Sequence, residues 1–264
     1  MIIDGTKIAR RIESELLKEV KKLKRKPSLA IIWVGENPAS EIYVQEKKEA
    51  CGRLGIDCYI HRLPENITQE KFFKLLRGLN KDKKINGIII QLPLPSSLDS
   101  EEILFSIAPW KDVDGLNPLI KTNIPPTTLA IIEAIKFTRI KLKGKYVVLV
   151  GYARHTTESL IPYLINQEAT ITVCHKSTKN LAVFTKKADL LIVAAGRPKL
   201  IKSSMIKKGA IVIDVGINRI GKRIVGDVDF ERVKKKAKFI TPVPGGIGPL
   251  TVMMLIKNLI KLCK

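Results

Sequence analysis

The chain has 264 residues, of which 45% are hydrophobic, and its formal net charge is +22. That length and apolar fraction suit one large or two modest globular domains and exclude a disordered chain. No apolar run approaches the length that spans a bilayer, and the N-terminus lacks a signal-peptide layout, so we expect no membrane partner. The four cysteines form no Cys-x-x-Cys pair, which favours a reducing, cytoplasmic location.

The net charge of +22 is also typical of proteins that bind nucleic acid. However, the lysines follow the whole chain, and aromatic residues, on which bases could stack, make up only 5%. We therefore interpret most of the charge as solvated surface, which also attracts small ligands with phosphates or carboxylates. A basic nucleic-acid-binding α/β protein remains a distant alternative.

The first part of the chain predicts helices and strands in alternation. Apolar residues recur at helical spacing from Ile8 to Leu23, and this helix ends before Pro27. The next elements are a buried strand 29–34, a helix from Ser40 to about Leu54, a strand 56–61, a helix from Thr68 to about Leu79, a strand 87–91 and a short helix 100–107. This alternation predicts parallel βαβ units.

A proline-rich connection then marks the expected domain boundary, between residues 117 and 118. After a helix from about Thr128, a second α/β set follows. Its predicted strands are 146–150, 170–174, 190–194 and 210–215, and its predicted helices are 157–167 and 179–186. An apolar helix with Pro249 in its first turn ends the chain.

Gln91 is the one polar side chain of an otherwise apolar strand, and it stands at the carboxyl end before Pro93. In open α/β sheets ligands bind at that edge, although Gln91 alone also fits a strand end that faces solvent. Tyr43 and Lys47 lie four residues apart on a predicted helix and share a face. Without any catalytic role, the pair could simply be an exposed lysine whose side chain covers a half-buried tyrosine. A lysine that handles protons must instead be desolvated and hydrogen-bonded, and Gln91 could supply the bond.

Asp112-Val113-Asp114-Gly115 resembles a fragment of a calcium loop, but its ligand spacing breaks off at Gly115, so we predict no metal site. The stretch fits either an Asp-Gly turn or a carboxylate offered to the N–H groups of a ligand.

Several motifs, taken in chain order, resemble one family. They are Gly35-Glu36-Asn37-Pro38-Ala39-Ser40, Tyr43-Val44-x-x-Lys47, Gly87 to Pro95, Lys111 to Gly115, Thr172 to His175, Asp214 to Asn218, and Pro244 to Thr251. Together they are similar to bifunctional methylenetetrahydrofolate dehydrogenase/methenyltetrahydrofolate cyclohydrolase, the FolD family. The resemblance covers nearly the whole chain.

The resemblance implies two α/β domains with a cleft between them. Residues 1–117 would be the folate-binding, catalytic domain, with a C-terminal helix 250–264 packed back onto it, and residues 118–249 a Rossmann-like NAD(P)-binding domain. A cytoplasmic homodimer is also implied. The expected activity is oxidation of 5,10-methylenetetrahydrofolate by NAD(P)+, with NADP slightly favoured over NAD, followed by hydrolysis of the methenyl form to 10-formyltetrahydrofolate.

The same resemblance implies roles for individual residues. Lys47 would be the central catalytic residue, Gln91 would tune it, Tyr43 would order the site beside the pterin, and Asp114 would bind the pterin's aminopyrimidine edge. Further substrate contacts would come from Leu92, Pro93, Pro244, Gly245 and Gly248. Dinucleotide contacts would come from Gly151, Tyr152, Ala153, His175, Lys176, Ser177, Ala195, Gly196, Ile217 and Thr251.

The predicted nucleotide end departs from the family pattern. After Gly151 the family's usual Arg and Ser are Tyr152 and Ala153, and Lys176 stands where the family often has Ser. Glu158 would lie near a helix N-terminus, where it stabilises the helix but repels phosphate. One alternative is therefore a cyclohydrolase with weak or absent dehydrogenase activity.

Overall fold

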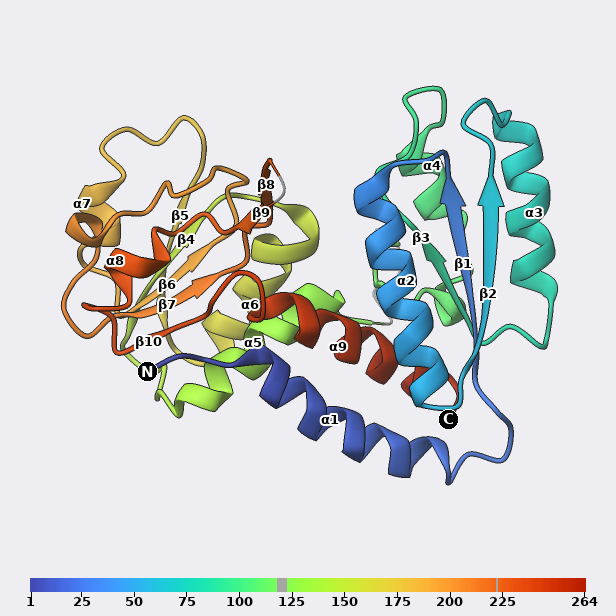
Figure 1. Ribbon diagram of the computed structural model, residues 1–264, viewed down its shortest axis with the longest axis horizontal. Helices are drawn as coiled ribbons and strands as arrows, with labels where there is room; N and C mark the ends of the chain where they lie inside the picture. Colours follow the sequence, from blue (N-terminus) through green and yellow to red (C-terminus); the bar gives the residue numbers. More distant parts are fainter. Residues whose placement is uncertain (118–122, 222) are drawn as a thin grey trace. The chain divides into compact units, whose positions relative to one another are not determined.

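The computed structural model describes residues 1–117, 123–221 and 223–264 of a mixed α/β protein. The chain forms two compact units, which we name by their sheets. The three-stranded unit contains Arg11–Pro126 and Val252–Lys264, and the five-stranded unit contains Met1–Arg10 and Thr127–Thr251 (Figure 1). No helix in these described ranges is long and apolar enough to cross a membrane.

The bounds of the two units differ from the domains expected from the sequence. The change of unit comes after Pro126, and residues 118–122, beside the expected boundary, lie outside the described part of the chain. Residues 1–10 join the five-stranded unit because Ile3 N donates a hydrogen bond to Ile240 O at 2.8 Å, which ties the N-terminus to that sheet. The last helix changes unit after Thr251.

The three-stranded unit is built on a parallel sheet with the order β2-β1-β3. The elements in this part of the chain are α1 (Gly5–Val20), β1 (Ser28–Val34), α2 (Pro38–Arg53), β2 (Asp57–Leu63), α3 (Gln69–Lys81), β3 (Gly87–Ile90), α4 (Ser100–Phe105) and η1 (Pro109–Lys111). Every residue of β1 and β3 is buried. Their near-continuous apolar sequences follow from this burial, since both faces of the sheet are covered.

The five-stranded unit is built on a second parallel sheet, with the order β10-β7-β6-β4-β5. The elements here are α5 (Pro126–Thr138), β4 (Tyr146–Val150), η2 (Arg154–Glu158), α6 (Ser159–Asn166), β5 (Thr170–Cys174), α7 (Ala182–Thr185), β6 (Leu190–Val193), η3 (Ser203–Met205), β7 (Ile211–Asp214), β8 (Asn218–Ile220), β9 (Arg223–Val225), α8 (Phe230–Val233), β10 (Phe239–Ile240) and α9 (Ile247–Leu262). The chain winds outward from β4 in both directions, as in Rossmann-like sheets, so the predicted fold class is confirmed.

Several short elements differ from the sequence prediction. The first helix ends at Val20 instead of Leu23, and the helix predicted over 179–186 shrinks to α7. The antiparallel hairpin β8–β9 was not predicted, because its residues are largely exposed and show no apolar alternation. β10 was also missed, because it contributes only two residues to the edge of the sheet beside β7.

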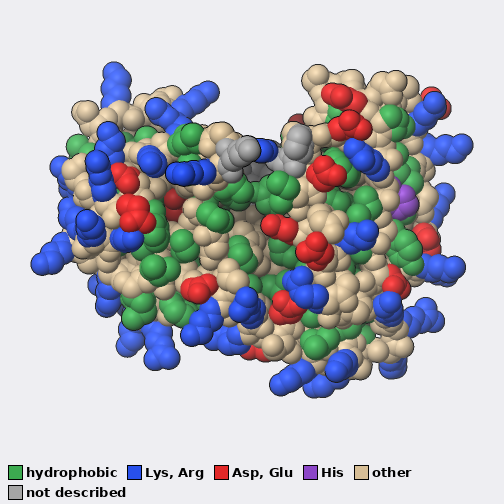
Figure 2. Space-filling view, in the orientation of Figure 1, with side chains coloured by type: hydrophobic (Ala, Val, Ile, Leu, Met, Phe, Trp, Pro, Cys, Tyr) green, Lys and Arg blue, Asp and Glu red, His purple; other side chains and the backbone are tan. Residues whose placement is uncertain are grey.

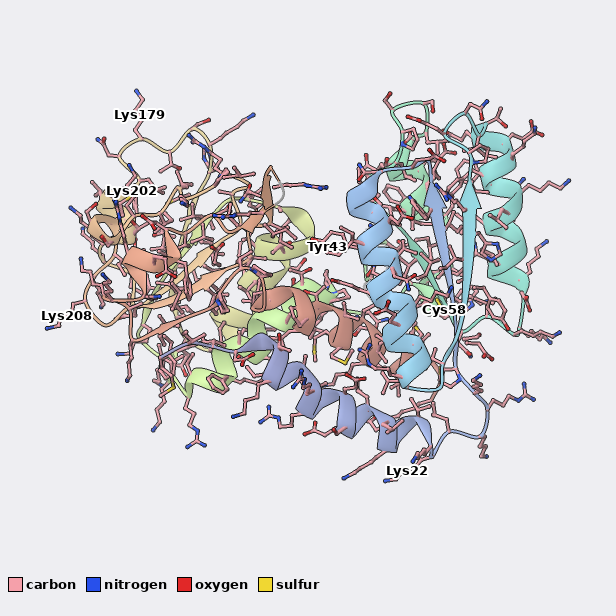
Figure 3. The ribbon with its side chains drawn as sticks, in the orientation of Figure 1. Lys22, Tyr43, Cys58, Lys179, Lys202 and Lys208 are labelled. Atoms are coloured by element: carbon pink, nitrogen blue, oxygen red, sulfur yellow. The ribbon has the colours of Figure 1, made fainter. Side chains whose placement is uncertain are left out.

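On the face of the molecule drawn in Figure 2, basic side chains are spread out instead of forming one stripe. Figure 2 shows Lys and Arg side chains over both units on the face in view. Lys179 and Lys208 point outward from the five-stranded unit (Figure 3), and Lys202 is also exposed. This distribution agrees with a solvated basic surface.

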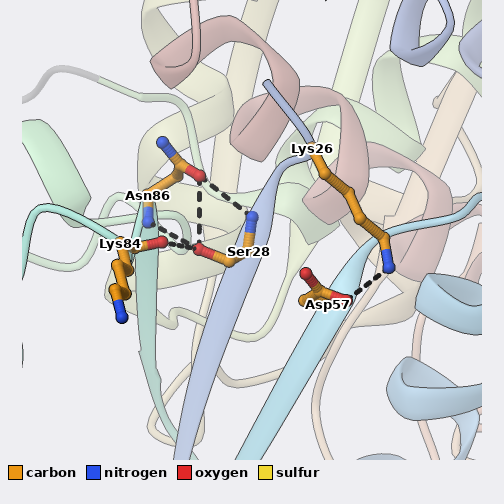
Figure 4. Close-up of polar contacts among 5 residues, drawn as sticks. All are labelled: Lys26, Ser28, Asp57, Lys84 and Asn86. Carbon is orange, nitrogen blue, oxygen red and sulfur yellow. Dashed lines mark hydrogen bonds and ion pairs between the residues drawn. The ribbon is translucent and has the colours of Figure 1, made fainter.

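A polar cluster aligns the amino ends of β1 and β3 (Figure 4). Ser28 N donates to Asn86 Oδ1 at 3.0 Å, Asn86 N donates to Ser28 O at 3.1 Å, and Ser28 Oγ donates to Lys84 O. Because side chains alternate along a strand, this register decides which face each residue of β3 meets, and it places Gln91 one residue beyond the strand's last pair.

The two faces of β3 have different neighbours. Ile88 and Ile90 pack in a cluster with Phe72 and Leu76 of α3. On the other face, a Cβ added at Gly87 would lie 2.3 Å from Val113 Cγ2 and 2.7 Å from a methyl carbon of Leu259 in α9. Glycine is therefore needed where α9 and the loop after η1 pack onto the strand.

We expect Gly87→Ala to lower the free energy of unfolding by about 1–3 kcal/mol, because its methyl group overpacks a filled interior. The matched control is Gly78→Ala in α3, where an added Cβ meets nothing within 4 Å. That helical substitution should raise the free energy of unfolding by about 0.5–1 kcal/mol. Both are measured by chemical denaturation, and wild-type stability in Gly87→Ala would contradict the packing described.

Candidate active site

A lysine from α2 meets a glutamine at the carboxyl end of β3. Lys47 Nζ donates a hydrogen bond to Gln91 Oε1 at 2.8 Å. Gln91 Nε2 donates to Leu92 O at 2.8 Å, which leaves the amide oxygen facing the lysine. Gln91 N donates to Ile32 O at 2.9 Å, so the backbone continues the β1–β3 ladder. The structure thus brings together two predicted site residues that are 44 positions apart.

The electrostatics of Lys47 are set by burial and by nearby negative charge. Burial lowers the pKa of Lys47, and the charges of Asp114, Glu46 and Cys58 act in the opposite direction. Burial raises the pKa of Asp114, and the Lys47 charge opposes that shift. Lys47 and Asp114 are therefore electrostatically coupled, and the lysine is easier to deprotonate than an exposed one.

Tyr43 lies one helical turn before Lys47 on α2, and Figure 3 labels the tyrosine on that helix. Its ring is half-buried. Burial raises the pKa of the Tyr43 hydroxyl, and the charge of Glu46 adds to that increase. The hydroxyl therefore keeps its proton at neutral pH and is available as a hydrogen-bond donor.

The loop that carries Asp114 is held at its start by a buried lysine. Lys111 Nζ donates to Leu79 O at 2.7 Å and to Asp82 O at 2.6 Å, at the carboxyl end of α3. Helices end in carbonyl groups without intrahelical partners, and a cation there is favourable. Lys111 had no predicted role, although its position within the Lys-Asp-Val-Asp-Gly motif singled it out.

Two amide side chains hold the rest of that loop. Asn258 Nδ2, from α9, donates to Val113 O and Ile124 O, both at 2.9 Å. Asn123 Nδ2 donates to Asp112 O at 2.9 Å. The sequence prediction missed Asn258. The sequence signal for Asn258 was an amide side chain within an apolar helix, because a polar group that becomes buried there needs hydrogen-bond partners.

The predicted dinucleotide residues follow the strands of the five-stranded sheet. Gly151 follows β4, His175 to Ser177 follow β5, Ala195 and Gly196 follow β6, and Ile217 follows β7. They therefore share the carboxyl edge of that sheet, where α/β proteins bind nucleotides. Thr251 lies instead in α9, where its Oγ1 donates to Ile247 O at 3.1 Å.

The local geometry of this edge fits a dinucleotide. Gly151 has a φ of +96°, and a Cβ there would lie 2.0 Å from Ala194 O, so two loop backbones meet closely. Gly196 has a φ of +63°, and a Cβ there would meet nothing within 4 Å. Tyr152, next to Gly151 in the chain, and Lys176, in the loop after β5, are both exposed. Loop backbones that meet at Gly151, open space at Gly196 and the positive charge of Lys176 are features that suit a phosphate-bearing ligand.

The atypical stretch after Gly151 forms a single π-helical turn, Arg154–Glu158, before α6. Thr157 Oγ1 accepts a hydrogen bond from Ala153 N at 3.0 Å. The helix predicted from Thr157 begins at Ser159, directly after Glu158, whose side chain makes no capping hydrogen bond. Glu158 therefore lies near a helix N-terminus, as predicted from the sequence.

The remaining predicted substrate residues divide between the units. Leu92 and Pro93 lie beside Gln91 in the three-stranded unit, whereas Pro244, Gly245 and Gly248 belong to the five-stranded unit. Gly245 has a φ of +95°, and its carbonyl accepts a hydrogen bond from Gly5 N at 2.9 Å. In the described part of the chain no group of three or more His, Cys, Asp or Glu residues could hold a metal ion.

Residues 3–114 match the family described as "Tetrahydrofolate dehydrogenase/cyclohydrolase, catalytic domain". Residues 125–264 match its partner, "Tetrahydrofolate dehydrogenase/cyclohydrolase, NAD(P)-binding domain". The chain belongs to this family. The Bifunctional protein FolD of Nautilia profundicola is 45% identical over 275 positions, which cover 100% of this chain and 97% of that protein.

Solved structures of the family have the same fold. The FolD enzyme of Campylobacter jejuni is 42% identical with a TM-score of 0.96, over 100% of this chain and 98% of that one. The Trypanosoma brucei enzyme, solved with NADP cofactor and an inhibitor, is 34% identical with a TM-score of 0.96, over 100% and 97% of the two chains. The resemblance first identified from the motifs is thereby confirmed.

We expect Asp114→Asn to lower the pKa of Lys47 further, because the substitution removes a negative charge that favours the ammonium form. NMR titration of the lysine side chain measures this pKa. Asp82→Asn is the control, since Asp82 acts on the pKa of Lys111 instead. A Lys47 pKa that is unchanged or raised in Asp114→Asn would show that the carboxylate does not act on it.

Proposed function

We infer that this protein oxidises 5,10-methylenetetrahydrofolate with NAD(P)+ and hydrolyses the methenyl product to 10-formyltetrahydrofolate, as an enzyme of one-carbon metabolism. The observation that carries this conclusion is the 2.8 Å hydrogen bond between Lys47 Nζ and Gln91 Oε1, in a chain that matches both domains of the family. The two activities divide the chemistry between proton transfer and hydride transfer.

Hydrolysis requires protons to move at a carbon–nitrogen centre. Water adds to the electrophilic methenyl carbon and loses a proton, and the nitrogen whose bond to carbon breaks gains one. We assign this exchange to Lys47, because its lowered pKa brings the amine and the ammonium closer in free energy near neutral pH. Both forms retain an N–H donor, so the bond to Gln91 Oε1 holds Nζ in place through the whole cycle.

The Gln91 amide suits this role better than a carboxylate would. A carboxylate paired with Lys47 would favour the ammonium form and raise its pKa. A neutral oxygen orients Nζ with a much weaker effect on its charge. Asp114 acts on the charge of Lys47 from a loop that Lys111 and Asn258 support, and we assign its carboxylate to the N–H groups of the pterin.

Oxidation requires the dinucleotide, which when bound supplies the acceptor for the hydride. We propose that the loops after β4, β5 and β6 position it through Gly151, His175 to Ser177, Ala195 and Gly196. The close approach of Gly151 to Ala194, with open space above Gly196, supports this assignment. Lys176 and Ser177 are the side chains proposed to meet a 2′-phosphate.

We also propose that the protein is a cytoplasmic homodimer. The family resemblance is the reason for the dimer. The location is supported by Cys51, Cys58, Cys174 and Cys263, which are all free thiols. The nucleic-acid alternative has no comparable support, because the basic side chains on the face drawn in Figure 2 are dispersed and aromatic residues make up only 5% of the chain.

We expect Lys47→Ala to lower the rate of methenyl hydrolysis by about 10²-fold or more, the range for removal of a group that transfers protons. The loss of methenyltetrahydrofolate absorbance measures this rate. Lys48→Ala, an exposed neighbour on the same helix, should keep the wild-type rate. Full hydrolysis in Lys47→Ala would remove this residue from the mechanism.

The wild-type protein should form reduced nicotinamide from methylenetetrahydrofolate in the presence of NAD+ or NADP+, because the carboxyl edge of the five-stranded sheet fits a dinucleotide. Parallel assays with each dinucleotide decide the cofactor. Hydrolysis of the methenyl form with no oxidation by either dinucleotide would leave the cyclohydrolase as the sole activity. Tight nucleic-acid binding without folate turnover would favour the distant alternative.

A further inference from the structure

A fully buried carboxylate, Asp227, organises the carboxyl edge of the five-stranded sheet. Its Oδ2 accepts hydrogen bonds from Ala195 N at 2.6 Å and Gly196 N at 2.9 Å. Its Oδ1 accepts from Arg197 N at 2.8 Å and from Asn218 Nδ2 at 2.7 Å. One side chain thus collects three successive backbone N–H groups and an amide from a separate hairpin.

Three successive N–H groups that converge form a concave anion site of the kind that binds phosphate in many proteins. Here the protein's own carboxylate fills that site, so this group of N–H donors is not available to a ligand. Asp227 therefore determines the path of the 195–197 backbone. A charge-assisted bond at each N–H makes that path stiff.

The surrounding sequence makes room for this carboxylate. A Cβ on Gly216 would lie 2.2 Å from Asp227 Cγ, and one on Gly226 would lie 1.9 Å from Asp214 Oδ2. Asp214 in turn accepts hydrogen bonds from Asp227 N at 3.0 Å and Val228 N at 2.9 Å. Two glycines and a second buried carboxylate thus fix where Asp227 stands.

The segments that Asp227 holds carry the dinucleotide residues of the proposed function. Ala195 and Gly196 are bonded to it directly, and Asn218 joins Ile217 to it. On the other side, the backbone at Ala194 packs against Gly151, where a Cβ would be only 2.0 Å from the carbonyl oxygen. A shift of the 195–197 loop would therefore disturb the Gly151 turn as well.

We propose that Asp227 is the positioning residue of the dinucleotide half of the site, which its carboxylate assembles from the loops after β6 and β7. This inference rests on the proposed function and deepens it. Asp227 touches neither reactant in this proposal. It acts through the backbone of residues 195–197, and the hydrolysis centred on Lys47 does not need it.

The test compares Asp227→Asn with Asp189→Asn. Asp189 is a matched control because Asp189 Oδ2 also accepts a backbone hydrogen bond, from Tyr146 N at 2.9 Å, but at the amino edge of the same sheet. For each variant, NADH and NADPH binding is titrated by fluorescence, amide hydrogen exchange of residues 195–197 is measured, and methenyl hydrolysis is assayed without dinucleotide. Asn218→Ala, which removes a single bond, is the milder second variant.

In Asp227→Asn, an NH₂ group, which is a hydrogen-bond donor, replaces a carboxylate oxygen that accepts bonds from backbone N–H groups, so at least one of these bonds is lost. We expect the dinucleotide Kd to rise about 10-fold or more, the size expected for a lost bond to a charged group. Exchange at residues 195–197 should accelerate while hydrolysis keeps its wild-type rate, and Asp189→Asn should leave the Kd and hydrolysis unchanged. Asn218→Ala should raise the Kd by a smaller factor.

An unchanged Kd in Asp227→Asn, or losses of binding and hydrolysis by the same factor, would overturn the positioning role. A wild-type protein that binds neither NADH nor NADPH would instead contradict the proposed dehydrogenase function. The two failures are distinguishable because the first appears only in the variant.

Discussion

The chemistry proposed for this protein depends on one hydrogen bond, from Lys47 Nζ to Gln91 Oε1. The glutamine stands at the end of β3, a fully buried strand whose last residue directly precedes it. The Leu92 carbonyl holds the amide in the orientation that presents its oxygen. Burial moves the lysine toward its neutral form, and an uncharged acceptor positions it without reversing that shift. Sheet packing and proton chemistry are thus parts of one arrangement.

The loops beyond the strand ends are held by single buried polar side chains. Lys111 and Asn258 bind the carbonyls of the segments around the Asp114 loop, and Asp227 binds the N–H groups after β6. Buried backbone groups in irregular loops have no strand or helix partner and must find one elsewhere. A cation or amide donor satisfies carbonyls, whereas a carboxylate satisfies N–H groups. Both units therefore use long-range side-chain contacts to keep their edges in place.

Much of the fold could be predicted from apolar periodicity. The buried strands β1, β3, β4 and β6 were predicted because their sequences are nearly continuous runs of apolar residues. The hairpin β8–β9 was missed because its largely exposed strands show little periodic pattern, and α7 is shorter than the helix predicted there. In the candidate site, the residues alone allowed a bond between Lys47 and Gln91, and the family resemblance implied it; the structure contains that bond.

The sequence by itself determined the α/β class, the family motifs and the residue types at the carboxyl ends of the strands, because these depend on local spacing and polarity. Only the tertiary structure decided which partners those residues have. Asn258 contacts Val113 from a position 145 residues away, and Asp227 contacts Ala195 from 32 residues away. No local pattern encodes such pairs, since they form only when packing brings distant backbone groups out of water together.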